Sequence, residues 1–356
     1  MSKDIGIDLG TANILVHLKG HGVVLNEPSI LAIDRKTQEV IAIGKEAYEM
    51  IGRTPASIEV VRPLKGGVIA DFDLAEVLLV LFLEKINTRS WFSKPNILIC
   101  CPSNISEIEQ LSLVEAAERA TGGKIYIEEE PKIAAVGAGV DLLSPRGSMV
   151  IDLGGGTTDI AVLSAGDILH SESIKVAGDD LDATIIQYFK DQFQLLIGER
   201  SAEQIKIKLS SAMRLDEAEL EYAVVKGRDL ATGLPRSINV NSNHIFEAIE
   251  HHLISIARLA KTVLEDIPPE IASDIIEQGI IITGGGALIY HIDTFLTDYL
   301  NVSVLKADQP MTCVAIGTGL MLDLILSGKL ERNQITKTKG SRVGQFFKRL
   351  KRRLLG

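Results

Sequence analysis

Three glycine-rich turns hold the residues of this sequence that could act on a phosphate group. They are DLGTAN (8–13), DLGGGTTD (152–159) and TGGGA (283–287). A glycine turn lets backbone N–H groups approach phosphate oxygens, because no Cβ stands in the way. Asp8 and Asp152 open the first two turns and would repel phosphate, so we expect them to hold the water shell of a Mg²⁺ that neutralises the phosphates.

The first two turns belong to an internal repeat. Each follows an apolar strand pattern, at 4–10 and 148–154, and each leads into two further strand patterns about 145 residues apart in the two copies. One such turn alone could be an ordinary tight hairpin, but two in register favour a phosphate site. Apolar spacing predicts helices over 74–87, 106–121, 180–195, 201–214, 244–265 and 312–328. The sequence therefore predicts an α/β fold of two similar halves with a cleft between them, and it contains no GxxxxGK[ST] loop of a P-loop enzyme.

Charge is distributed unevenly along the 356 residues. The net charge is −10, yet nine basic and no acidic residues follow Glu331, which leaves 28 basic against 47 acidic residues up to and including Glu331. An acidic body disfavours broad binding to nucleic acid. The three cysteines, Cys100, Cys101 and Cys313, fit no metal spacing. With no membrane-spanning apolar run and no signal-peptide pattern, we expect a cytoplasmic protein with reduced core cysteines.

Two segments could contact a membrane. The polar stretch NTRSWFSKP (87–95) holds the aromatic pair Trp91 and Phe92, which could also form a buried corner of the core. In the tail after residue 331, a helical wheel places the large apolar residues within an arc of about 100° and basic residues opposite. This pattern is typical of an interfacial helix on anionic lipid, although a partner-protein helix and a nucleic-acid tail remain alternatives. The apolar residues of the tail are Val343, Phe346, Phe347, Leu350 and Leu354.

The turns and many stretches around them resemble the bacterial actin MreB family, within the superfamily of actin, sugar kinases and heat-shock chaperone ATPases. The match runs from residue 4 to about residue 326, and FSKPNILICCPSNIS and YIEEEPK look most like the MreB-like (Mbl) branch. Other stretches that carry it are IGIDLGTANILVHLKG, RPLKGGVIADF, EEEPKIAA, MVIDLGGGTTDIAV, IGERSAEQIKIKLSSA, GRDLATGLPRSI, IITGGGAL and CVAIGTGLMLD.

The resemblance implies an actin-like fold with ATP and Mg²⁺ bound between two duplicated domains. Domain I would span 1–145 with a small subdomain at about 33–74, domain II would span 146–330 with one at about 181–243, and 331–356 would be a basic linker and tail. Glu130 would orient the attacking water, with Glu128 and Glu129 as rivals. The residues that would contact the nucleotide are Thr11, Ala12, Asn13, Gly154, Gly155, Gly156, Thr157, Glu203, Gln204, Ile205, Lys206, Gly284, Gly285, Gly286, Ala287 and Leu288.

The resemblance also implies a function. It indicates a filament-forming ATPase that organises cell-wall elongation, peptidoglycan synthesis and rod shape at the inner face of the cell membrane. Trp91, Phe92 and the tail would touch anionic lipid. The implied partners are further copies of this chain in paired protofilaments, MreB paralogues, and RodZ-like and MreC/MreD-like membrane proteins. A sugar-type kinase of the same superfamily is the alternative, whereas a chaperone would need a substrate domain for which too few residues remain.

Overall fold

The computed structural model describes residues 4–86, 94–101 and 106–330, which form two compact units. Unit 1 holds the chain up to Ile133 and again from Ala315, and unit 2 holds Ala134–Val314. The chain passes from one unit to the other inside the helices α4 (Glu130–Gly137) and α10 (Cys313–Leu326). The contacts thus place 315–330 with unit 1, whereas the sequence placed it with domain II, and the domain limits remain predictions.

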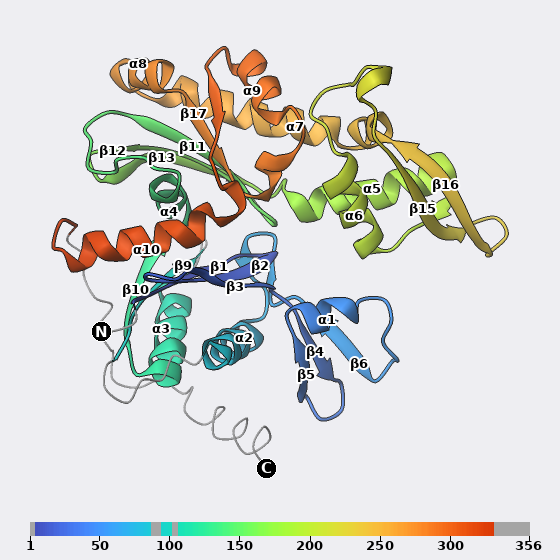
Figure 1. Ribbon diagram of the computed structural model, residues 1–356, viewed down its shortest axis with the longest axis horizontal. Helices are drawn as coiled ribbons and strands as arrows, with labels where there is room; N and C mark the ends of the chain where they lie inside the picture. The colour runs from blue at the N-terminus through green and yellow to red at the C-terminus, as the bar shows by residue number, and fades with distance from the viewer. Residues whose placement is uncertain (1–3, 87–93, 102–105, 331–356) are drawn as a thin grey trace. The chain divides into compact units, whose positions relative to one another are not determined.

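A five-stranded mixed sheet is the centre of unit 1 (Figure 1). The first strand pairs antiparallel with the second and parallel with a strand whose paired residues lie 92 positions later. The order across the sheet is β10 (Lys124–Glu129), β9 (Asn96–Cys101), β1 (Asp4–Leu9), β2 (Asn13–Leu18) and β3 (Gly22–Pro28). The first two hairpin strands match the predictions at 4–10 and 13–20, whereas the stretch expected as one strand at 22–34 forms two strands, the second of which, Leu31–Asp34, belongs to another sheet.

Both faces of this sheet are covered by helices, which explains why every residue of β1 after Asp4 is buried. Ile5 and Ile7 join the core formed with α2 (Phe72–Lys85) and α3 (Glu107–Thr121). On the opposite face Gly6 meets α10 so closely that a Cβ at residue 6 would overlap the hydroxyl of Thr318. Strands buried on both faces read as continuous apolar runs, as this one does.

Short elements complete unit 1. A three-stranded sheet has its own small core around Ile30, Ala32 and Ala47. Its strands are β5 (Val40–Ile43), β4 (Leu31–Asp34) and β6 (Ile58–Val61), with α1 (Lys45–Glu49) alongside and a β7–β8 hairpin (Leu64–Lys65, Val68–Ile69) after them.

The main sheet of unit 2 repeats the topology of unit 1. Three consecutive strands pair antiparallel. Two later strands then extend the sheet in parallel, beginning next to the first of the three. The order is β13 (Asp167–Ile174), β12 (Thr158–Ser164), β11 (Ser148–Leu153), β17 (Ile280–Thr283) and β18 (Val304–Lys306). Because β11 occupies the place of β1 and β17 that of β9, the structure confirms the internal repeat predicted from the two turns.

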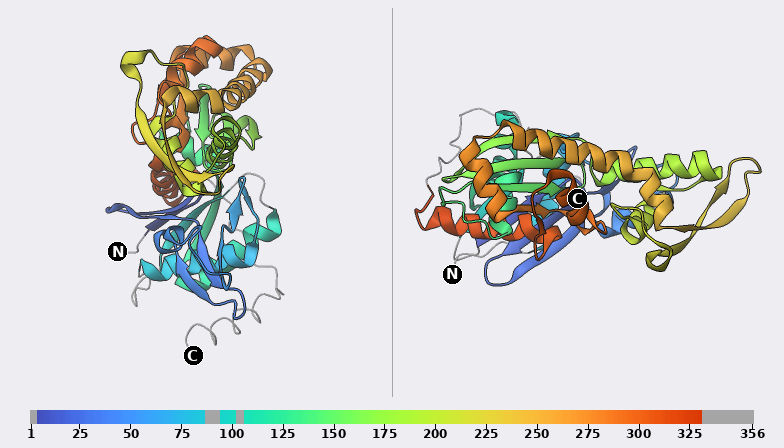
Figure 2. Two further views of the ribbon diagram at one scale, coloured as in Figure 1. Left: turned by 90° about the vertical axis from the view of Figure 1, so that its right-hand side faces the viewer. Right: turned by 90° about the horizontal axis from the view of Figure 1, so that it is seen from above.

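Five helices and a small sheet accompany this second main sheet. The small sheet, in the order β14 (Leu195–Leu196), β15 (Tyr222–Asp229) and β16 (Pro235–Asn241), stands at the end of unit 2 away from β11–β13, with α5 and α6 between them (Figure 2). The helices are α5 (Gly178–Phe193), α6 (Glu199–Leu209), α7 (Ser242–Asp266), α8 (Pro269–Gln278) and α9 (Ile292–Leu300). Short 3₁₀ turns occur at Glu217–Glu219, Gly285–Leu288 and Pro310–Thr312.

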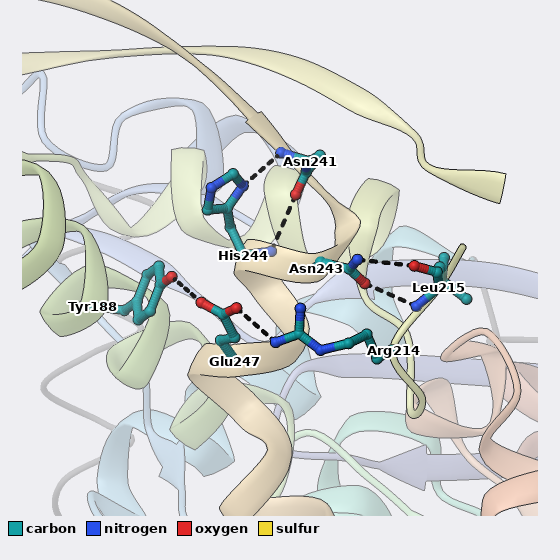
Figure 3. Close-up of polar contacts among 7 residues, drawn as sticks. All are labelled: Tyr188, Arg214, Leu215, Asn241, Asn243, His244 and Glu247. Atoms are coloured by element: carbon teal, nitrogen blue, oxygen red, sulfur yellow. Dashed lines mark hydrogen bonds and ion pairs between the residues drawn. The ribbon is translucent and has the colours of Figure 1, made fainter. Parts of the chain in front are cut away.

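Polar side chains fix the start of α7, the longest described helix (Figure 3). Asn241 and His244 form a reciprocal capping box, which satisfies two N–H groups at the helix start. One turn later the Glu247 carboxylate accepts hydrogen bonds from Tyr188 of α5, at 2.9 Å, and from Arg214, at 2.8 Å. The Tyr188 bond ties α7 to α5, whose first residues contact the turn at 154–157 discussed below.

The predicted helices agree with the structure within a few residues, apart from the end of α6. The sequence extends that helix to residue 214, but it ends at Leu209 because Ser210 is extended. Ser211 then pairs with Tyr290, and the N–H of Ala212 bonds to the carbonyl of the same tyrosine. Among the described residues no helix is both long and apolar enough to cross a membrane.

One buried carboxyl of unit 1 makes its stability depend on pH. Glu76 of α2 is 3% exposed, and its burial, opposed by Arg119 and aided by Asp73 and Glu115, raises its pKa to about 7. Between pH ~4.5 and ~7 the unfolded chain loses this proton and the folded chain keeps it, so stability falls as pH rises through that window. At pH 8 Glu76→Gln should therefore stabilise the protein by about 1–3 kcal/mol.

Thermal unfolding at pH 5 and pH 8 measures this effect. The glutamine variant should melt above the wild type at pH 8 and close to it at pH 5, where the glutamate is protonated. Glu84→Gln, at an exposed position of the same helix, is the control and should leave the difference between the two pH values unchanged. Equal gains at both pH values would contradict the assignment.

Candidate phosphate and metal site

The turn at 154–157 of unit 2 joins β11 to β12 and is tied to the start of α5. The Gly154 N–H bonds to the Thr157 carbonyl at 3.0 Å, while the Gly154 and Gly155 carbonyls accept N–H groups of Gly178 and Asp179 at 3.2 and 2.8 Å. The described hydrogen bonds use no N–H group of Gly155 or Gly156. The turn therefore holds its carbonyls toward α5 and keeps backbone donors for an anion, as a phosphate loop requires.

Asp152 is the buried acid of this turn. It is 2% exposed, and its Oδ1 accepts a hydrogen bond of 2.7 Å from the hydroxyl of Thr283 on β17. Burial raises the pKa of Asp152 to about 6, against the opposing effect of the Thr283 hydrogen bond, and the charge of Asp159 raises it further. A bound cation would favour the ionised form, because an opposite charge nearby stabilises a carboxylate.

The third glycine turn lies directly beside Asp152. Gly284 follows β17 with a positive φ of 80°, and a Cβ there would overlap the carbonyl of Leu153 and lie 2.8 Å from Asp152 Oδ1. Gly285 has no atom within 4 Å of the place where its Cβ would be. Ala287 is fully buried, whereas Leu288 is 54% exposed. The turn is thus closed toward Asp152 and open at Gly285, where a flat ligand could lie against backbone.

The four predicted nucleotide contacts on α6 have different environments. Ile205 is 6% exposed and belongs to the hydrophobic core, so only its backbone could meet a ligand, while Gln204 is exposed and Glu203 partly so. The Lys206 ammonium donates to the Gly178 carbonyl and to Asp182, each at 2.8 Å. Lys206 therefore links α6 to the start of α5 and hence to the turn at 154–157.

The corresponding turn in unit 1 has the same construction. Asp8 is 7% exposed at the end of β1, and Thr11 is 8% exposed in the turn. Ser29 closes the turn, because its hydroxyl donates to the Gly10 carbonyl at 2.6 Å and its N–H to the Ala12 carbonyl at 2.9 Å. Asn13 begins β2. The unit thus places a buried acid and a short turn where unit 2 has Asp152 and its glycines.

The three consecutive glutamates lie at the junction of β10 and α4. Strand alternation buries Glu128, which is 2% exposed, and leaves Glu129 exposed. Glu130 is partly exposed and is the first residue of α4. Burial and these three carboxylates raise the pKa of the adjacent Cys101 thiol to about 12, which keeps it uncharged. Of the three, Glu130 combines partial exposure with a fixed helical start.

Two residues near the turns were given no role by the sequence. Asp182 pairs with Lys206, and burial raises the pKa of its carboxyl to about 6 despite that lysine. Thr283 belongs to the TGGGA turn that the sequence indicated, but its hydrogen bond to Asp152 was not predicted. The predicted membrane residues lie outside the described part of the chain: Trp91, Phe92, Phe346, Phe347, Leu350 and Leu354.

Comparison with known proteins identifies the family. The family model described as MreB/Mbl protein matches residues 2–329. The chain is 55% identical to the cell shape-determining protein Mbl of Bacillus cereus, over 91% of this chain and 97% of that protein. Its fold matches crystal structures of MreB5 of Spiroplasma citri bound to ADP (38% identity, TM-score 0.86, 92% and 98% coverage) and to AMPPNP (37%, 0.85, 93% and 99%). The chain has an actin-like fold and belongs to the MreB/Mbl family.

Proposed function

We propose that this protein is an ATPase of the bacterial cytoskeleton and that its phosphate turns bind ATP with Mg²⁺. The observation that carries the proposal is the repeated site: two equivalent strands each end in a buried aspartate and a short turn. The similar MreB5 of Spiroplasma citri was solved with ADP and with AMPPNP. Nucleotide binding is thus supported by this chain's geometry and by its relatives.

Each group of predicted site residues would have its own role in binding or hydrolysing ATP. Backbone donors at 11–13 and 155–156 would bind phosphate, and Asp8 and Asp152 would hold waters of the Mg²⁺. The ion would neutralise phosphate charge when bound. Glu203, Gln204 and Lys206 of α6, with the open turn at 284–288, would hold the adenosine. Glu130 would orient the attacking water, since positioning and charge stabilisation account for most of the rate of phosphoryl transfer.

We further propose that the ATPase cycle serves polymerisation. The protein would assemble into filaments, in paired protofilaments, and organise cell-wall elongation and rod shape from the cytoplasmic side of the cell membrane. Membership of a family whose relatives are named cell shape-determining proteins supports this role. The proposed partners are MreB paralogues, RodZ-like and MreC/MreD-like membrane proteins, and the anionic membrane surface.

Pelleting combined with a phosphate-release assay tests the proposal. Purified protein should sediment with ATP and Mg²⁺ and release phosphate in proportion to the amount polymerised. Asp152→Asn should lose most of the Mg²⁺-dependent sedimentation. Phosphate release that requires an added sugar, with no sedimentation, would instead identify a small-molecule kinase.

Trp91 gives a direct test of lipid contact, because it is the only tryptophan in the chain. An indole prefers the headgroup boundary, and a filament repeats a weak contact at every subunit. On addition of anionic vesicles to polymerised protein, we expect the tryptophan emission to shift to shorter wavelength.

Three controls separate the contributions of loop and tail. Neutral vesicles should give a smaller shift, because the tail loses its electrostatic attraction. Deletion of 331–356 should weaken vesicle binding, but the tryptophan emission should still shift at high lipid concentration. The Phe92→Ala variant should show a smaller emission shift than the wild type. An unchanged emission spectrum with vesicle-bound filaments would contradict lipid contact by Trp91.

A further inference from the structure

We infer that Thr283 is a positioning residue that fixes the Asp152 carboxylate for the hydration shell of the bound Mg²⁺. The inference rests on the proposed nucleotide function and deepens it, because it assigns a role to a side chain that would touch neither nucleotide nor metal. It concerns residues of unit 2 alone.

Sheet register places Thr283 beside Asp152. The two residues face each other on the parallel strands β11 and β17, and Thr283 is fully buried. Its hydroxyl donates to Asp152 Oδ1 at 2.7 Å, and no described hydrogen bond goes to Asp152 Oδ2. The hydroxyl therefore orients the carboxylate and leaves one oxygen for another donor, such as a metal-bound water.

The surroundings of Oδ1 close that side of the carboxylate. A Cβ at Gly284 would lie 2.8 Å from this oxygen, so the backbone of the third turn lies directly against it. A glycine backbone carries no charge that would compete with a cation, and the described side-chain hydrogen bond to the carboxylate comes from Thr283.

The internal repeat supplies a comparison within the same chain. In unit 1 the residue that faces Asp8 across the parallel strands is Cys100, in the place that Thr283 occupies in unit 2. A thiol is a weaker donor than a hydroxyl. The position that faces the aspartate thus carries a hydroxyl in unit 2 and a thiol in unit 1. The step that needs Mg²⁺ should depend on Thr283 accordingly.

The test measures binding of a fluorescent ADP analogue to the full chain in EDTA and across a Mg²⁺ titration. Thr283→Val keeps the shape and removes the hydroxyl, Thr283→Ser restores the hydroxyl, and Thr283→Cys reproduces the arrangement of unit 1. Thr121→Val is the matched control, because Thr121 is a buried threonine of unit 1 whose hydroxyl donates to the Ala117 carbonyl at 2.7 Å.

For Thr283→Val we expect nucleotide affinity in EDTA within about twofold of the wild type and a half-saturating Mg²⁺ concentration raised about tenfold, as loss of one hydrogen bond to a charged group allows. The serine variant and the Thr121→Val control should match the wild type, and the cysteine variant should lie between. If the valine variant fails to fold, the cysteine and serine variants decide the question.

Failure of the Thr283 inference and failure of the proposed function would give different results. A folded Thr283→Val or Thr283→Cys variant with the Mg²⁺ dependence of the wild type would overturn the role of Thr283 and leave the proposed function intact. A wild type that binds no nucleotide in either condition would overturn the proposed function and this inference with it.

Discussion

Replacing Glu130 with alanine is expected to slow phosphate release by about 100-fold or more, the usual effect of losing a positioned acid–base group. ATP affinity should stay within about twofold of the wild type, because the proposed role of Glu130 is to orient the attacking water and not to bind the phosphates. A single-turnover phosphate-release assay, with nucleotide binding measured separately, distinguishes the two effects.

The neighbouring glutamates are the controls for this experiment. Glu129→Ala removes an exposed carboxylate at the end of β10 and should leave turnover nearly unchanged. Glu128 is buried, so its alanine variant should lose stability before it loses chemistry. Near-normal turnover in Glu130→Ala would contradict its role and direct attention to Thr158 and Asp159. Of these two, Thr158 donates its hydroxyl to the Val176 carbonyl at 2.7 Å, which is a structural contact.

Although Gly284 and Gly285 are adjacent, Gly284→Ala should lower the stability of the protein, whereas Gly285→Ala should weaken its nucleotide binding. At Gly284 the backbone, with φ of 80° and ψ of 173°, costs an alanine about 1–3 kcal/mol, and its Cβ would also overlap the Leu153 carbonyl. We therefore expect Gly284→Ala to lower the melting temperature of unit 2 by several degrees or to prevent its folding.

At Gly285 a methyl group meets no protein atom within 4 Å, so Gly285→Ala should melt like the wild type. If the adenosine lies against this backbone, the same methyl group should weaken nucleotide binding about tenfold or more. Thermal unfolding with and without ADP measures both effects. Unchanged affinity in Gly285→Ala would show that the nucleotide does not use this surface, and a Gly284→Ala variant as stable as the wild type would contradict the packing argument.

Local patterns in the sequence were sufficient for the parts of the site that are continuous in the chain. The two Asp-Leu-Gly turns end strands of six residues in both units, and each buried aspartate is where the pattern places it. The strands were recognisable because β1 and β11 are mostly apolar and almost wholly buried, as strands covered on both faces are.

Contacts between distant segments could not be read from the same patterns. Asp152 and Thr283 are 131 positions apart, and only the parallel pairing of β11 with β17 brings them together. The early end of α6 has a similar origin, because pairing of Ser211 with Tyr290 replaces the helix that apolar spacing favours. Lys206 was predicted to be a site residue, but its partners at the start of α5 depend on how two helices pack.

The most direct measurement is negative-stain electron microscopy of the full chain on an anionic lipid monolayer with ATP and Mg²⁺. The account predicts paired filaments on the lipid, fewer without nucleotide, and detachment when Trp91 and Phe92 are replaced by alanine and 331–356 is deleted. The absence of filaments under all conditions, together with ADP release that depends on an added sugar, would contradict the cytoskeletal function.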